Sequence, residues 1–120
     1  MGDNLTAAPL YFVITVPGKY GETAAAITEF VIAFVMMTMI LFTSSDRRLK
    51  KYTRIFSAIL VCVYAIVAGP VSGFGMNPAR SFASALPAKI WTDFWIYLFT
   101  PFAGMLGAAE FYLLVRSKKV

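Results

Sequence analysis

Long apolar segments restrict most strongly what this chain can fold into. Three of them cover about residues 23–43, 54–71 and 91–115, and 59% of the 120 residues are hydrophobic while only 14% are charged. Soluble domains are about 45–50% apolar and about 25% charged. A helix needs about 20 apolar residues to cross a bilayer. The sequence therefore predicts an all-α integral membrane protein with three transmembrane helices in contact with the lipid bilayer.

The distribution of lysine and arginine predicts the orientation. Apart from Arg80, which lies between the second and third expected helices, only Lys19 and Lys89 lie on one side of the expected helices, and all other basic residues lie on the opposite side. Loops rich in Lys and Arg stay in the cytoplasm. We therefore expect a lead-in at 1–22 on the extracellular side and a cytoplasmic basic tail at 117–120. The segment between the second and third helices then enters and leaves the membrane from outside. The basic residues on the cytoplasmic side are Arg47, Arg48, Lys50, Lys51, Arg54, Arg116, Lys118 and Lys119.

That entering segment contains Asn77, Pro78, Ala79 and Arg80. Asparagine is a preferred N-cap and proline suits the first helical position. The pair therefore predicts a re-entrant half-helix over about 78–86, ended by Pro87. Irregular backbone at membrane depth is tolerated only inside protein or beside a water-filled cavity. An ordinary helix cap is the alternative reading, and the membrane setting with the adjacent arginine favours a pore.

The backbone before the motif has a second predicted role. Gly69, Gly73 and Gly75 permit an extended conformation, in which carbonyls of Gly73, Gly75 and Met76 line a lumen and accept hydrogen bonds. A half-helix carries about half a positive charge at its N-terminus, which opposes cations. The Asn77 amide and the Arg80 guanidinium can donate hydrogen bonds while these carbonyls accept them. Such an arrangement suits small neutral solutes that carry hydroxyl groups.

Composition argues against other classes of protein. The chain has no histidine and one cysteine, Cys62, so it has no intrachain disulfide and suggests no metal site, no cofactor and no enzyme. Its net charge of +5 comes from basic residues at segment ends. They form no stripe interleaved with aromatic residues, so nucleic acid is not an expected partner.

The residues also carry a family resemblance. GFGMNPARSF, at 73–82, resembles the second asparagine–proline–alanine loop of the aquaporin, or major intrinsic protein, family. Three further stretches resemble its helices and loops, and the similarity covers roughly residues 8–116. They are Thr28-Glu29-Phe30, Asp46-Arg47-Arg48, and Trp95-Ile96-Tyr97 with Pro101, Phe102 and Gly104.

The resemblance implies six membrane spans and two half-helices arranged as inverted repeats, assembled as a homotetramer. Residues 23–116 correspond to the second repeat alone. We therefore expect the chain to be a fragment or truncated product that needs the missing first repeat to complete a pore. Its charge bias argues against a second, inverted copy taking that place.

The resemblance also assigns site residues. It implies a pore motif at Asn77, Pro78 and Ala79, and a selectivity filter at Arg80, Phe74 and Ala65. Glu29 would support the loop, with a purely structural role as its alternative. A small Ala65 would give a wider and less polar constriction. A bulky Phe74 resembles glycerol-conducting relatives, whereas Ser81 and Tyr97 resemble water channels and Leu98 departs from them. Water is the expected solute, with glycerol or another small neutral solute also open.

Two other functions remain open at this stage. A non-conducting scaffold or assembly-modulating half-protein would associate through small residues such as Gly104 and Ala108, whose spacing suits close helix contact. A transporter with alternating access is disfavoured because no coupling-ion site is suggested.

Overall fold

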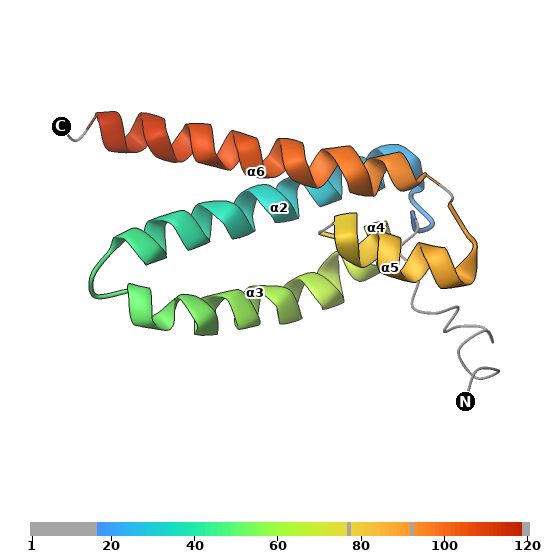
Figure 1. Cartoon of the computed structure of the whole chain (residues 1–120), viewed down its shortest axis with the longest axis horizontal. Coiled ribbons are helices and arrows are strands. Elements are labelled where there is room, and N and C mark those ends of the chain that lie inside the picture. The colour runs from blue at the N-terminus through green and yellow to red at the C-terminus, as the bar shows by residue number, and fades with distance from the viewer. Residues whose placement is uncertain (1–16, 77, 92, 119–120) are drawn as a thin grey trace.

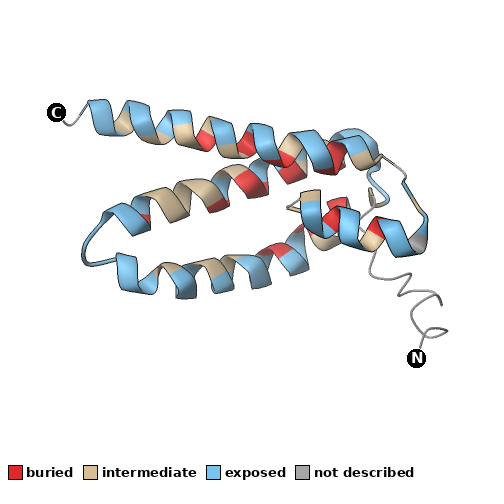
Figure 2. Ribbon diagram, viewed as in Figure 1, coloured by how far each residue is buried: buried red, intermediate tan, exposed pale blue. Residues whose placement is uncertain are grey.

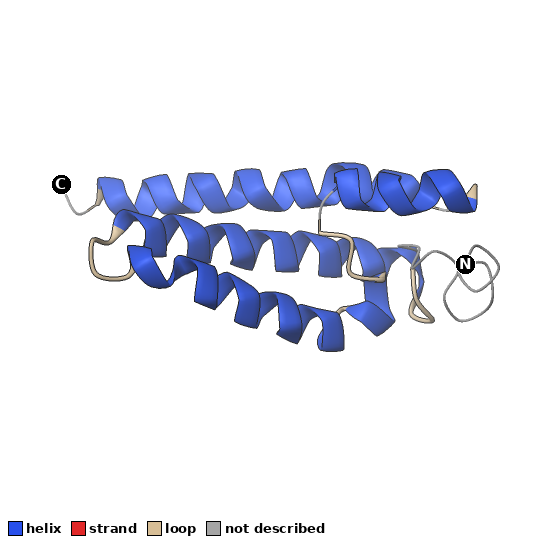
Figure 3. Ribbon diagram, turned by 60° about the horizontal axis from the view of Figure 1, so that its bottom comes forward, coloured by secondary structure: helices blue, strands red, loops and turns tan. Residues whose placement is uncertain are grey.

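The computed structural model describes residues 17–76, 78–91 and 93–118, and all regular structure in these ranges is helical (Figure 3). This confirms the predicted all-α class. Most of the lead-in at 1–22, the motif residue Asn77 and the end of the tail at 117–120 lie outside the described residues. The elements are α2 (Gly21–Ser45), the 3-10 helix η2 (Lys50–Tyr52), α3 (Thr53–Val67), α4 (Gly69–Ser72), α5 (Pro78–Ala88) and α6 (Phe94–Ser117).

Two of the described helices, α2 with 25 residues and α6 with 24, are long and apolar enough to cross a membrane. The segment predicted over 54–71 is instead divided at Ala68 into a 15-residue helix, α3, and the short α4. Pro70 has no N–H to donate to the carbonyl four residues earlier, so the regular helix cannot run through it. The count of three spans therefore stays a prediction.

The main packing surface lies between α2 and α6, which run side by side (Figure 1). Ala25, Ile96 and Tyr97 are fully buried there. Gly104 permits the closest approach, because a Cβ built on it would lie 2.5 Å from the Phe30 carbonyl oxygen. Buried residues gather along this seam and around the segment from α4 to α5, whereas the opposite end is mostly exposed (Figure 2). The core thus includes residues just before and just after the motif, among them Phe74 and Ser81.

Helix α3 leaves most of its apolar surface uncovered. Tyr64 is its buried residue, whereas Ile59 is 56% exposed and Ile66 is 77% exposed. Large exposed apolar surfaces mark contact with lipid or with another protein. This surface is therefore suited to an apolar environment outside the described part of the chain.

Helix α5 begins in the interior and runs toward the end of the molecule where α2 begins (Figure 1). It starts at Pro78, as predicted, but it continues through Pro87 to Ala88. The predicted end at 86, set by Pro87, is wrong by two residues, because a proline in the last turn removes only one intrahelical bond. The chain leaves the helix at Lys89, where φ is 55°. The basic α2–α3 connection lies at the opposite end, beside the C-terminal part of α6.

The seam gives a first testable prediction. Gly104→Ala should destabilise the fold by about 1–3 kcal/mol relative to Gly107→Ala, because overpacking forces the helix backbones apart. A Cβ on Gly107 would lie 3.5 Å from the nearest Phe34 carbon, which is ordinary contact. Both changes share the gain in helix propensity. Thermal unfolding in detergent measures the difference, and equal stabilities would contradict the close approach at Gly104.

Candidate functional site

A carboxylate buried in the middle of the apolar helix α2 organises the site. Glu29 is 0% exposed. Its Oε1 accepts hydrogen bonds from the Ser72 hydroxyl at 2.7 Å and from the Gly75 N–H at 2.9 Å. Its Oε2 accepts one from the Met76 N–H at 2.6 Å. Burying a carboxylate is costly unless it is paired or hydrogen-bonded. The donors of the loop at 72–76 remove that cost for Glu29, and Glu29 in turn provides acceptors for the loop.

Ser72 and Tyr97 complete this network. Both side chains are fully buried. The Ser72 hydroxyl also accepts a hydrogen bond from the Phe74 N–H at 3.2 Å, and the Ser72 carbonyl accepts one from the Tyr97 hydroxyl. The loop is therefore held to α2 through Glu29 and to α6 through Tyr97.

Sequence reasoning missed Ser72 altogether and gave Tyr97 only a family-based role in selectivity. A hydroxyl residue inside an apolar, glycine-rich stretch was the available signal for Ser72. Nothing in the sequence paired it with a carboxylate 43 positions away.

The loop backbone is tightly folded. Gly73, Phe74 and Met76 have positive φ values of 76°, 53° and 54°. This left-handed region is open to glycine and unfavourable for other residues, so the hydrogen bonds to Glu29 and Ser72 must hold Phe74 and Met76 there. Gly69 lies within α4. The prediction that Gly69 and Gly73 belong to an extended stretch is wrong, because the helical bonding continues from Ala68 to Gly73 and Gly73 itself is left-handed.

These hydrogen bonds fix where the loop carbonyls point. In a trans peptide the C=O and the following N–H point in opposite directions. The N–H groups of Phe74, Gly75 and Met76 all point into the Glu29–Ser72 network. The carbonyls of Gly73, Phe74 and Gly75 therefore point away from it. Phe74 was not among the carbonyls predicted from sequence, and the Met76 carbonyl belongs to the next peptide unit, beyond these three hydrogen bonds.

The structure brings two of the three predicted filter residues together. The Arg80 guanidinium carbon lies 4.8 Å from the centre of the Phe74 ring, within the range of a cation–π contact. Phe74 is buried and packs against Tyr64 of α3 at a ring-centre distance of 6.3 Å. Ala65, the third, is the next residue along α3 and is exposed. Arg80 is also exposed.

Helix α5 begins shortly after this loop. Pro78 is its first residue, two positions after Met76, which is bonded to Glu29. Ser81, one turn into the helix, is almost fully buried, and its hydroxyl has no hydrogen-bond partner in the described part of the chain. Across residues 17–118, apart from 77 and 92, no group of three His, Cys, Asp or Glu side chains is placed to hold a metal ion.

Comparison of the sequence with known proteins identifies the family. The sequence model of the family described as Major intrinsic protein matches residues 4–112. The chain is 35% identical over 111 residues to "Probable aquaporin NIP-type" of Nicotiana alata, covering 91% of this chain and 40% of that protein. It is 35% identical to "Aquaporin NIP1-4" of Oryza sativa subsp. japonica over 103 residues, covering 85% and 37% of the two chains.

A third relative, "Putative aquaporin NIP4-1" of Arabidopsis thaliana, is 32% identical over 114 residues, covering 89% of this chain and 40% of that protein. The chain belongs to the major intrinsic protein family, as the resemblance predicted. It spans about two fifths of the length of these relatives.

The site gives a second prediction. Glu29→Gln should lower the free energy of unfolding by about 1.5–3 kcal/mol, the contribution of a hydrogen bond to a charged group. A glutamine amide has one acceptor oxygen, so its NH₂ group would face one of the three donors. Glu110→Gln is the control, because Glu110 is exposed on α6. Hydrogen exchange at the Gly75 and Met76 amides should accelerate in the Glu29 variant alone. Unchanged exchange there would contradict the proposed support of the loop.

Proposed function

We propose that this chain is the second repeat of a passive membrane channel that conducts water and small neutral solutes such as glycerol. The observation that carries the proposal is the loop at 72–76. Glu29 takes up its N–H groups, so a row of carbonyls points away from α2 immediately before a helix that begins at Pro78. A row of fixed acceptors beside a helix N-terminus can replace the hydrogen bonds that water or a polyol makes in solution.

The motif residues supply the opposing charge and donors. We assign the pore constriction to Asn77, Pro78 and Ala79, at the N-terminus of α5. That end carries about half a positive charge, so it repels cations while the carbonyls accept hydrogen bonds from neutral solutes. Protonated water chains are disfavoured for the same reason.

Arg80, Phe74 and Ala65 are the proposed selectivity filter. The contact between the Arg80 guanidinium and the Phe74 ring supports the first two, because it holds a fixed cation beside a bulky apolar wall. Ala65 would contribute a small side chain from α3 and leave the selectivity filter wide. This combination would admit, besides water, solutes that are larger or less polar than water, such as glycerol.

The pore needs a partner repeat. Relatives of this chain are longer than it is, and one repeat has too few helices to enclose a pore. A cavity of about 320 Å³ between α2 and α3, lined by apolar residues that include Ile27, Val31, Val63 and Val67, is a suitable surface for the first repeat. We propose that the completed channel is a multi-pass homotetramer with its C-terminus in the cytoplasm.

Osmotic shrinkage of vesicles tests the proposal. The chain is reconstituted with a first repeat from a related aquaporin supplied as a separate polypeptide, and light scattering follows vesicle volume. We expect water permeability well above that of empty vesicles, and a loss of most of the increase in Glu29→Gln. Permeability equal to that of empty vesicles, despite demonstrated assembly, would favour the non-conducting scaffold.

Removing the fixed charge of the filter gives a separate prediction. Arg80→Ala should keep water permeability within about threefold but raise the leak of protons or small cations at least tenfold, which corresponds to about 1.4 kcal/mol of lost electrostatic barrier. Arg54→Ala is the matched control, since Arg54 is exposed on α3 at the opposite end. A pH-sensitive dye inside the vesicles measures the leak. Equal leaks in the two variants would remove Arg80 from the filter.

A further inference from the structure

The end of the molecule opposite α5 carries a concentrated positive surface, here called the basic end. It is formed by two segments far apart in the sequence, the α2–α3 connection and the C-terminal turn of α6. All of its described basic residues are exposed, and none forms an ion pair within the described part of the chain. They are Arg47, Arg48, Lys50, Lys51, Arg54, Arg116 and Lys118.

Hydrogen bonds hold the two segments together. The Tyr112 hydroxyl of α6 lies 2.5 Å from the Ser45 hydroxyl at the end of α2, and it also accepts a hydrogen bond from the Arg116 guanidinium. The ring of Tyr112 packs edge-on against Phe42 at a ring-centre distance of 5.1 Å. Arg116 is thereby fixed beside the basic connection, although 62 or more positions separate them in the chain.

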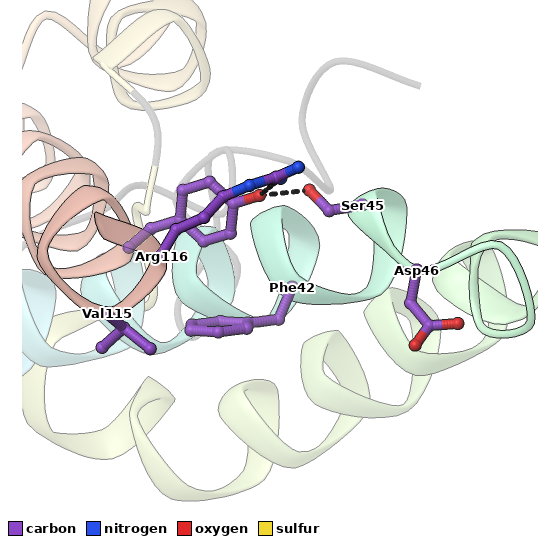
Figure 4. A pocket seen from close by; sticks show the side chains of 6 residues that line it. Phe42, Ser45, Asp46, Val115 and Arg116 are labelled. Atoms are coloured by element: carbon purple, nitrogen blue, oxygen red, sulfur yellow. Dashed lines mark hydrogen bonds between the residues drawn. The ribbon is translucent and has the colours of Figure 1, made fainter. Parts of the chain in front are cut away.

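A shallow cavity of about 200 Å³ lies at this junction, lined by Phe42, Ser45, Asp46, Tyr112, Val115 and Arg116. Ser45 and Arg116 point toward each other, joined through the Tyr112 hydroxyl, whereas the Asp46 carboxylate points away from them (Figure 4). Asp46 Oδ1 accepts the N–H groups of Arg48 and Leu49, so the carboxylate is turned into its own loop. The joined groups are hydroxyls and a guanidinium, which suit a phosphate.

Apolar side chains stand among the cations. Leu49 is 40% exposed and Tyr52 is 42% exposed, and the Lys51 ammonium lies 4.8 Å from the centre of the Tyr52 ring. Cations beside single apolar side chains such as Tyr52 and Leu49, at the end of membrane-length helices, match the headgroup region of a bilayer. Clusters of four to eight basic residues in this position attract anionic lipids.

We propose that the basic end binds the phosphorylated headgroup of an anionic phospholipid, with the phosphate seated between Arg116 and the connection that contains Arg48. This would fix one lipid at the junction of α2 and α6, a contact independent of whether the chain conducts. Each basic residue near the membrane surface raises the affinity for an anionic lipid about fivefold through electrostatic attraction.

Native mass spectrometry of the full chain in neutral detergent tests the proposal, with phosphatidylinositol 4,5-bisphosphate as the probe and phosphatidylcholine as the neutral lipid. We expect one anionic lipid to bind preferentially. Arg48→Gln combined with Arg116→Gln should weaken its binding about 25-fold. Lys19→Gln combined with Lys89→Gln removes the same charge at the opposite end and should change it less than twofold. Unfolding temperatures check that both variants are folded.

Three results would overturn the proposal. The two lipids could bind equally, which would show that the protein does not distinguish headgroups by their charge. The two double variants could lose affinity equally, which would show a general charge effect and no site at the basic end. Soluble inositol trisphosphate could bind as tightly as the lipid, which would identify a site for a free phosphate in place of a membrane contact.

Discussion

The hydrogen bonds between the Glu29 carboxylate and the loop at 72–76 join parts of the chain that would otherwise have no reason to meet. Glu29 lies in the middle of an apolar helix, and its charge must be satisfied where no water is at hand. The loop has N–H groups with the same need, because its left-handed residues cannot bond within a helix. The loop N–H groups satisfy the carboxylate, and the carboxylate satisfies them. The loop is thereby held at the depth of Glu29, inside the ends of α2.

The direction of the carbonyls follows from that anchoring. Since the N–H groups of Phe74, Gly75 and Met76 face the carboxylate and the Ser72 hydroxyl, the carbonyls of the peptide units face away. Tyr97 adds a second attachment from α6. The geometry of a candidate permeation path is thus a consequence of how one buried acid is satisfied, and the close seam at Gly104 keeps the two supporting helices in contact.

Local chemistry explains which features were predictable. Pro78 begins α5 because proline suits a first helical position whatever lies around it, and the apolar runs of α2 and α6 predict long helices. The break at Ala68, the extension of α5 past Pro87 and the helical state of Gly69 depend on bonding around the prolines and in the loop. Ser72 was missed because its partners, Glu29 and the Tyr97 hydroxyl, come from other helices.

By itself, the sequence determined an all-helical protein of the major intrinsic protein family, with the long apolar helices α2 and α6 and a helix beginning at Pro78. These follow from apolar composition, segment length and a proline-led motif, which act within one segment. The third span that it predicted over 54–71 is divided at Ala68 in the structure. Only the tertiary structure decided that Glu29 bonds Gly75 and Met76, that Arg80 lies over Phe74, and that Arg116 joins the basic connection at Ser45. The contacts of Glu29 arise because a buried carboxylate must find hydrogen-bond donors. Those of Arg80 and Arg116, which are exposed, arise because helix packing brings separate segments side by side.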